Sequence, residues 1–302
     1  MARIIILGSI NMDVVVMTPR HPNPGETLFG SDLKFIPGGK GANQAVAASR
    51  LGGDVVLVGK LGEDAFGSAL QKFLEEENLN LDHLYFSQDT PSGTALITVD
   101  ENAENRIIVV PGCNAELSPA DFGSLSITAD DILVSVFEIP QETIKAAFQT
   151  AKEVGAKTIL NPAPAAPFIE GLQDLCDTLI VNETELSFFS GEDANPDVLE
   201  SLHRQARAIR STASQIIIVT LGGNGAVCLQ GDDFFSVAGN KVEAVDTTAA
   251  GDCFTGALAV ALKEGLSLSD AIRFANFAAS LSVQKVGASA SLPYRQEVNG
   301  LL

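Results

Sequence analysis

Residues 132–160 read ILVSVFEIPQETIKAAFQTAKEVGAKTIL. The segments at 132–136 and 158–160 are apolar and rich in β-branched side chains, which is typical of buried strands. Between them, residues 141–154 carry apolar side chains at the three- and four-residue spacing of a helix. A strand, a helix and a second strand in this order predict two parallel strands joined by a crossover helix.

The same alternation continues in both directions along the chain. Further strand-like runs lie at residues 4–7, 55–58, 179–181 and 216–220. Segments with helical periodicity lie at residues 42–51, 65–76, 197–211, 251–264 and 268–284. Strands that alternate with helices predict a three-layer α/β/α fold, in which helices cover both faces of a mostly parallel central sheet. We expect residues 1–302 to form a single domain.

Two segments, at about 12–36 and 90–111, break this alternation. In the second, strand-like residues 94–99 and 106–110 flank a polar turn at 100–105, as in a β-hairpin. We expect both segments to form a second, smaller β-sheet that acts as a lid. Its exposed edges would need to be covered, which predicts a homodimer through the lids.

Charge and composition exclude several kinds of partner. The formal net charge of −19, from 38 acidic and 19 basic residues, opposes binding to nucleic acid or to an anionic membrane surface. No apolar run approaches the roughly 18 residues of a membrane span, so we expect a cytoplasmic protein with no membrane partner. A small anion such as ATP remains compatible, because an N–H pocket and a divalent cation act locally.

The candidate for chemistry is the segment DTTAAGD at residues 246–252, which leads into the apolar run CFTGALAVAL. A helix that begins within residues 249–252 would present unpaired N–H groups and its positive dipole end, which together bind anions. Asp252 would place a carboxylate beside this anion site. A polarised phosphate next to a base is what phosphoryl transfer from a nucleotide requires. The alternative is that Asp246 and Asp252 only cap the first helical turn.

Polar side chains near the amino-terminal half suggest a pocket for a small hydroxylated ligand. The glycine turn around Lys40 and Asn43 is not a Walker A loop, because glycine follows the lysine, but it delivers two donors at a helix start. Asn11 and Asp13 alternate along an extended segment and could share one face. The alternative for the glycine turn is a plain turn with no ligand, and the alternative for Asn11 and Asp13 is a polar bend that satisfies its own backbone. Glu138 follows the strand at 132–136, where open α/β sheets bind ligands.

Two further motifs follow predicted strands. Asn182 and Glu185 could orient a Mg²⁺ ion mainly through water, or they could form a helix-capping box. The glycine-rich residues 220–225 could admit a nucleotide closely, or they could be a tight hairpin turn. The histidines share no ligand spacing, so we expect surface or structural roles for them.

Together these segments resemble the ribokinase family of carbohydrate kinases, of the phosphofructokinase-B type. The resemblance runs almost from end to end. It rests on residues 8–13 (GSINMD), 24–27 (PGET), 38–48 (GGKGANQAVAA), 161–165 (NPAPA), 182–185 (NETE) and 244–252 (AVDTTAAGD).

The resemblance implies roles for individual residues. The sugar would be surrounded by Asn11, Asp13, Gly39, Lys40, Asn43, Glu138 and Asp252, the last also acting as the catalytic base. ATP would be contacted by Asn182, Thr220, Leu221, Gly222, Gly223, Asn224, Gly225, Gly251, Asp252 and Asn276. The anion hole would comprise Ala249, Ala250 and Gly251. A monovalent cation, expected to be K⁺, would be bound largely through backbone oxygens by Asp246, Thr248, Ser282, Lys285, Gly287 and Ser291.

The implied reaction is phosphorylation of the 5-hydroxyl of D-ribose by ATP with Mg²⁺, which gives D-ribose 5-phosphate and ADP. A related kinase for 2-deoxyribose, fructose or adenosine is the first alternative, because one hydroxyl can redirect such a pocket. A non-catalytic regulator that binds sugar or nucleotide is the second. Asp252 beside Gly251 argues against a regulator, which has no need of a base at an anion hole.

Overall fold

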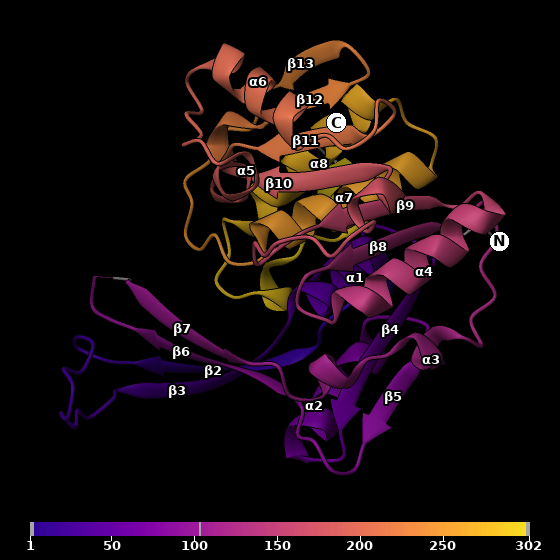
Figure 1. Ribbon diagram of the computed structural model, residues 1–302. Helices are drawn as coiled ribbons and strands as arrows, with labels where there is room; N and C mark the ends of the chain where they lie inside the picture. The colour runs from indigo at the N-terminus through magenta and orange to yellow at the C-terminus, as the bar shows by residue number, and fades with distance from the viewer. Residues whose placement is uncertain (1–2, 103, 300–302) are drawn as a thin grey trace.

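In the computed structural model, which describes residues 3–102 and 104–299, nine strands form the central sheet in the order β13-β12-β11-β10-β9-β8-β1-β4-β5 (Figure 1). These strands are β1 (Ile4–Leu7), β4 (Val55–Gly62), β5 (Leu84–Ser87), β8 (Ile132–Val136), β9 (Lys157–Asn161), β10 (Thr178–Asn182), β11 (Ile216–Thr220), β12 (Ala226–Gln230) and β13 (Asp233–Val237). The strands from β5 to β11 pair in parallel, whereas β12 and β13 pair antiparallel. The predicted mostly parallel sheet is confirmed.

Strand β1 shows why the sequence folds this way. Ile4 and Ile6 belong to the core on one face of the sheet, and Ile5 and Leu7 belong to the core on the other. All four side chains are at most 2% exposed. A central parallel strand is buried on both faces, so it needs a continuous apolar run where an antiparallel strand would alternate.

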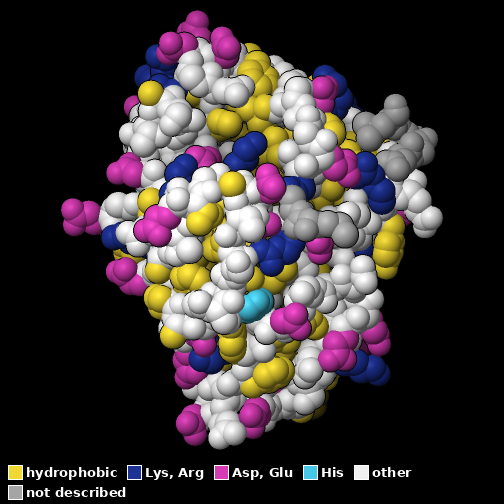
Figure 2. Space-filling view, turned by 90° about the vertical axis from the view of Figure 1, so that its right-hand side faces the viewer, with side chains coloured by type: hydrophobic (Ala, Val, Ile, Leu, Met, Phe, Trp, Pro, Cys, Tyr) yellow, Lys and Arg dark blue, Asp and Glu magenta, His cyan; other side chains and the backbone are white. Residues whose placement is uncertain are grey.

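Helices cover both faces of the sheet, as predicted (Figure 1). The core on one face includes residues of α1 (Lys40–Arg50), α2 (Ala65–Glu76), α7 (Ala250–Lys263), α8 (Leu268–Ser282) and α9 (Arg295–Asn299). The core on the other face includes residues of α3 (Pro119–Phe122), α4 (Gln141–Val154), α5 (Glu183–Ser190) and α6 (Leu199–Ile209). No helix within the described residues is long and apolar enough to cross a membrane. Acidic side chains are spread over the face shown in Figure 2, with basic ones among them.

Within the same described ranges, a second sheet of four strands projects from one edge of this body (Figure 1). Its strands are β2 (Asn11–Met17), β3 (Asp32–Gly38), β6 (Gly93–Val99) and β7 (Asn105–Val110), in the order β3-β2-β6-β7. The predicted hairpin strands are therefore present. Leu33, Phe35, Leu96, Ile107 and Ile108 of this sheet are exposed.

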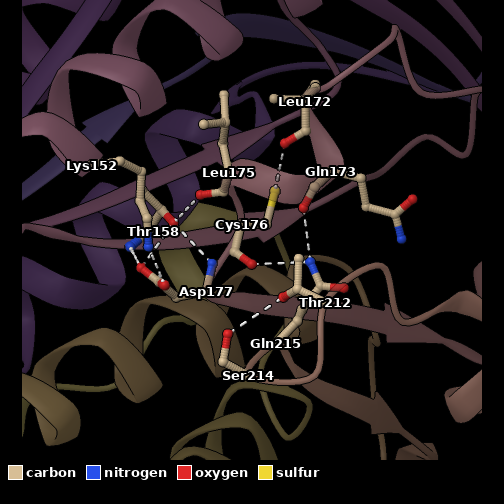
Figure 3. Close-up of polar contacts among 10 residues, drawn as sticks. All are labelled: Lys152, Thr158, Leu172, Gln173, Leu175, Cys176, Asp177, Thr212, Ser214 and Gln215. Atoms are coloured by element: carbon tan, nitrogen blue, oxygen red, sulfur yellow. Dashed lines mark hydrogen bonds and ion pairs between the residues drawn. The ribbon is translucent and has the colours of Figure 1, made fainter.

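Polar contacts connect the amino ends of the neighbouring strands β9, β10 and β11 (Figure 3). One oxygen of Asp177 accepts hydrogen bonds from the backbone N–H and the hydroxyl of Thr158, at 3.0 and 3.2 Å. The amide Nε2 of the buried Gln215 donates to the carbonyls of Gln173 and Cys176, at 2.9 and 3.0 Å. These side chains satisfy backbone groups where the ladder of sheet hydrogen bonds ends.

Candidate active site

Three of the cavities lie side by side along the carboxyl edge of the central sheet. The first, of about 480 Å³, is lined by the glycine loop that follows β11 and by residues of α7 and α8. The second, of about 170 Å³, shares Thr220, Thr247, Ala250 and Gly251 with it and reaches Asp252. The third, of about 390 Å³, is lined by Asn11 and Glu138 among others. Asp252 and Lys40 line the second cavity, and the N–H of Lys40 donates to Glu138 of the third.

Asp252 lies in the first turn of α7 and is 5% exposed. Its Oδ2 accepts a hydrogen bond from Asn43 Nδ2, and its Oδ1 accepts one from Gln44 Nε2, both at 3.1 Å. Burial raises the pKa of Asp252, although the charge of Lys40 and these two hydrogen bonds oppose the rise. Gln44 was not singled out in the sequence, where it reads as one more polar residue of the motif GANQ.

The start of α7 has an unusual backbone. Ala249, the residue that caps the helix, has φ 60° and ψ 10°, in the left-handed region that L-residues seldom adopt. The N–H of Ala250 donates to the carbonyl of Thr247 at 3.2 Å. No described acceptor takes the N–H groups of Ala249 or Gly251, and both residues line the 170 Å³ cavity. Two of the three predicted anion-hole donors are therefore free, and the third is partly engaged.

Lys40 and Glu138 join the first turn of α1 to the carboxyl end of β8. Glu138 Oε2 accepts the N–H of Lys40 at 3.1 Å and the hydroxyl of Ser9 at 2.5 Å. The charge of Asp252, opposed by desolvation, raises the pKa of Lys40. Ser9, fully buried, is a contact that the sequence alone did not indicate.

Asp13 and Asn11 lie on β2, at the root of the small sheet. Burial, reinforced by the charges of Glu138 and Asp252, raises the pKa of Asp13 to about 7. No described residue donates a hydrogen bond to the Asp13 carboxylate. Asn11 Oδ1 accepts a hydrogen bond from Asn114 Nδ2 at 2.7 Å, while its own Nδ2 has no described acceptor. Both side chains thus keep polar atoms for a ligand.

The backbone at Gly39 allows this close packing. Its φ of 88° is unfavourable for other residues, and a Cβ there would lie 2.7 Å from the backbone nitrogen of Asn11. Substitution of Gly39 would therefore push the glycine turn away from β2 and separate the polar groups that the two segments bring together.

The 480 Å³ cavity contains most of the predicted nucleotide-binding residues. Thr220, Gly222, Gly223, Asn224, Gly225, Gly251 and Asn276 line it. Asn276 Nδ2 donates to the carbonyls of Val237 and Ala238, at 3.2 and 3.3 Å. Asn182 and Asp252 line the 170 Å³ cavity instead, and Leu221 is 6% exposed and packs in the core.

Asn182 and Glu185 form the predicted capping box at the start of α5. Asn182 Oδ1 accepts the N–H of Glu185 at 2.8 Å, and Glu185 Oε2 accepts the N–H of Asn182 at 2.9 Å. Both residues also line the 170 Å³ cavity. Burial raises the pKa of Glu185. The second oxygen of Glu185 accepts no hydrogen bond from the described residues.

The predicted monovalent-cation residues come from the segment before α7 and the loop after α8. Asp246 ties the two together, because its carboxylate accepts the N–H groups of Thr248 and Gly287, each at 2.9 Å. The N–H of Lys285 donates to the carbonyl of Ser282 at 3.2 Å. Lys285 Nζ forms an ion pair with Glu297 at 2.8 Å and Ser291 Oγ donates to Ala288 O at 2.9 Å. The side chains are thus largely engaged within the protein.

The same loop is linked to Asp252 through Asn43. Ser289 Oγ donates to Asn43 Oδ1 at 2.7 Å, and Asn43 in turn donates to Asp252. Both atoms of the Asn43 amide are therefore occupied within the protein. Sequence reasoning placed Asn43 at the sugar and did not find Ser289, which carries no motif of its own.

Known proteins resemble this chain over its whole length. The pattern of the pfkB family carbohydrate kinases matches residues 1–295. A ribokinase of Lactococcus lactis subsp. lactis is 39% identical over 306 residues, which covers 100% of this chain and 97% of the relative. A deoxyribokinase of Salmonella typhi is 33% identical over 302 residues, or 99% of this chain and 98% of the relative.

Solved structures agree with the sequence relatives. The structure of Arabidopsis thaliana ribokinase complexed with ribose and ATP superimposes with a TM-score of 0.89 at 32% sequence identity, covering 100% of this chain and 99% of the other. The resemblance inferred from the sequence motifs is thereby confirmed. Fold, motifs and relatives agree from one end of the chain to the other, and the chain belongs to the pfkB family of carbohydrate kinases.

Proposed function

We propose that this protein is a ribokinase, which transfers the γ-phosphoryl group of ATP to the 5-hydroxyl of D-ribose. The observation that carries the proposal is the position of Asp252 in the 170 Å³ cavity, which adjoins the 480 Å³ cavity through their shared residues. A buried carboxylate there faces unbonded N–H groups at a helix start, which is the arrangement that phosphoryl transfer requires. The ribose named in the Arabidopsis complex and the 39% identity to the Lactococcus ribokinase support the choice of sugar.

The reaction follows from these groups. Asp252 accepts the proton of the 5-hydroxyl as that oxygen forms a bond to the γ-phosphorus, and the bond to the bridging oxygen of ADP breaks. The N–H groups of Ala249 and Gly251, with the partly engaged Ala250, stabilise the negative charge that develops on the phosphoryl oxygens. Burial increases the proton affinity of Asp252, which favours its action as a base.

The sugar pocket is assigned to the polar groups beside the small sheet. Asp13 accepts hydrogen bonds from vicinal hydroxyls, because its carboxylate has no described donor, and the free Nδ2 of Asn11 donates to another sugar oxygen. Lys40, Glu138 and the backbone of Gly39 complete the wall. Asn43 lies in this wall and holds Asp252 in place.

The nucleotide and its metal are assigned to the neighbouring cavities. The base and ribose of ATP fit the 480 Å³ cavity, and the phosphates point toward Asp252. Mg²⁺ neutralises phosphate charge when it is bound with ATP. Asn182 and Glu185 line the cavity where it would lie, and they would orient it mainly through its waters.

A monovalent cation, K⁺, fits the loop that Asp246 ties to Gly287. Because N–H groups already occupy the Asp246 carboxylate, the ligands would be mainly backbone oxygens of the predicted residues. The cation would hold the loop that carries Ser289, which contacts Asn43, and the segment that leads into α7.

The small sheet is proposed to be both a lid over the sugar and the contact between two subunits. Closure of the lid would exclude water from the phosphoryl group. The exposed apolar side chains of the sheet support a second copy of the chain as the partner. We place the enzyme in the cytoplasm, where ATP is available.

The experiment is a measurement of ADP release with ribose, 2-deoxyribose, fructose and adenosine as acceptors. The highest kcat/KM is expected for ribose. A higher value for another acceptor would identify a sister kinase on the same scaffold, such as a deoxyribokinase. Saturable binding of sugar and nucleotide without turnover would instead identify a regulator.

A further inference from the structure

A group of potential metal ligands lies at the outer end of the small sheet, away from the active site (Figure 1). His21 follows β2, while Asp100 and Glu104 lie in the turn between β6 and β7. Pairing of β2 with β6 brings these segments together, and the N–H of Thr18 extends the pairing with a 2.9 Å bond to the carbonyl of Val99. One ligand atom from each of the three side chains lies within 4.8 Å of the others.

Two of these side chains are held by further contacts, as metal ligands usually are. His21 Nδ1 lies 3.1 Å from Thr98 Oγ1, at hydrogen-bond distance, which leaves Nε2 as the other functional atom of the ring. Asp100 is 7% exposed, and its Oδ1 accepts the N–H groups of Asn102 and Glu104, at 2.9 and 3.0 Å. These bonds orient the ring and the carboxylate without using His21 Nε2.

Two buried polar atoms in this region have no hydrogen-bond partner. His21 Nε2 is buried and has no hydrogen-bond partner among the described residues. Thr18 Oγ1, three residues earlier, is also buried without a partner there. No ion pair or side-chain hydrogen bond joins His21 to either carboxylate in the described structure, although the ligand atoms are near one another. Buried polar atoms are rarely left unpaired, so the free Nε2 of His21 is a potential metal ligand.

We propose that His21, Asp100 and Glu104 form a binding site for a divalent transition-metal ion of the zinc type. One imidazole nitrogen and two carboxylate oxygens are a donor set that suits Zn²⁺, with water at the remaining position. Mg²⁺ prefers oxygen ligands, so this site is chemically distinct from the one proposed for Mg²⁺ with ATP. The ion would tie the segment after β2 to the β6–β7 turn and stiffen the outer end of the small sheet.

The test uses the full chain, freed of metal with a chelator and without ATP. Titration with Co²⁺ is expected to give visible absorption bands, which Zn²⁺ then removes by competition, and Zn²⁺ is expected to raise the melting temperature. Mg²⁺ at the same concentration is expected to do neither. His21→Ala and Asp100→Asn should each weaken the Zn²⁺ affinity by at least about tenfold, and Thr98→Val should weaken it by about tenfold through loss of ring orientation.

His83→Ala is the matched control, because His83 lies before β5, outside the small sheet, and should leave Zn²⁺ affinity unchanged. The melting temperature of each variant without metal shows that it folds, and Asp100→Asn keeps the shape of the loop if His21→Ala does not fold. Zn²⁺ affinity that is the same in the His21 and Asp100 variants as in the parent would overturn the proposal. The absence of Co²⁺ bands at millimolar Co²⁺ would also overturn it and would indicate a water molecule as the partner of His21 Nε2.

Discussion

Asp252 is the residue on which the proposed chemistry depends, and its two oxygens are held by Asn43 and Gln44. We expect Asp252→Asn to fold and to bind ATP, because it keeps the size of the side chain. Its kcat should fall by at least about 10²-fold, the lower range for loss of a positioned base. Single-turnover phosphorylation and ATP titration measure the two effects separately. Near-normal turnover would remove Asp252 from the role of base.

Gln44 is a positioning residue for this base. Its Nε2 bond to Asp252 favours the ionised carboxylate, whereas its own Oε1 is buried without a partner among the described residues. In Gln44→Met, loss of a hydrogen bond to a charged group, worth about 1.5–3 kcal/mol, should raise the pKa of Asp252 further.

The acid limb of the kcat profile should therefore move to higher pH by about one unit or more, because a raised pKa keeps the carboxylate protonated over a wider range. Gln71→Met, at a partly exposed position of α2, is the matched control and should leave the profile in place. An unchanged acid limb in Gln44→Met would show that Gln44 only fills space.

Asp13 gives a pH dependence that can be assigned to one group. With a pKa of about 7 in the folded protein, it binds a proton there between pH 4 and 7 that the unfolded chain releases. Because the native state holds more protons in this window, Asp13 stabilises the fold at low pH, and this contribution to the free energy of unfolding is lost as the pH rises through 7. Asp13→Asn should remove this part of the dependence.

Denaturant unfolding of both proteins at several pH values measures the difference. The free energy of unfolding of the parent, relative to Asp13→Asn, should fall between pH 4 and 7. A difference that does not vary with pH would contradict the raised pKa. Asp13→Asn should also raise the KM for ribose, since the amide offers the hydroxyls one acceptor where the carboxylate offers two.

At the scale of elements, the sequence predicted long and strongly periodic segments best. The helix expected at 141–154 and the strands expected at 4–7, 132–136 and 216–220 have those bounds in the structure. Strands β5, β12 and β13 were not predicted as sheet members. The edge strands β5 and β13 are short and only partly buried, so their sequence pattern is weak. Strand β12 is buried on both faces, and the sequence indicated it only through the alternative of a hairpin turn at 220–225. The sequence left two alternatives for Asn182 and Glu185, a helix cap or a metal site. The structure contains the capping box, and both residues also line the 170 Å³ cavity.

The amino ends of β10 and β11 provide a prediction that concerns stability alone. Gln215 is 1% exposed and satisfies the carbonyls of Gln173 and Cys176, far from the cavities of the active site (Figure 3). Gln215→Leu should lower the free energy of unfolding by about 1–3 kcal/mol, because buried carbonyls lose their donors. Kinetic constants should stay the same.

Ser214→Ala, at the exposed neighbouring position, is the control and should change the free energy of unfolding by less than about 0.5 kcal/mol. Equal stability of Gln215→Leu and the parent would show that water replaces the amide at these carbonyls. Urea unfolding followed by circular dichroism distinguishes the outcomes.

At the scale of the whole molecule, the small sheet carries exposed apolar side chains that a second subunit could bury. Ile108 is 65% exposed and Leu96 is 45% exposed on it, which is unusual for large apolar side chains of a sheet. Ile108→Lys is expected to convert a dimer into a monomer, because a charge would be buried at the subunit contact. Val286→Lys, at a position that is also exposed but outside this sheet, is the control.

Light scattering after size-exclusion chromatography measures the mass of each protein. A parent chain that is monomeric at micromolar concentration would contradict the homodimer. A dimer that persists in Ile108→Lys would place the subunit contact elsewhere on the molecule.

The sequence by itself determined the layered α/β architecture, the small second sheet and the family. Hydrophobic periodicity and short motifs depend on residues that are neighbours along the chain, so they can be recognised without the fold. It also indicated Asp252 as the proposed base, because the residues beside it along the chain form the motif. Only the tertiary structure decided which side chains hold that base and which groups remain free. Gln44, Ser289 and Asn114 act on residues far away in sequence, and His21 meets Asp100 only because β2 pairs with β6. Such contacts depend on how distant segments pack, which no local pattern encodes.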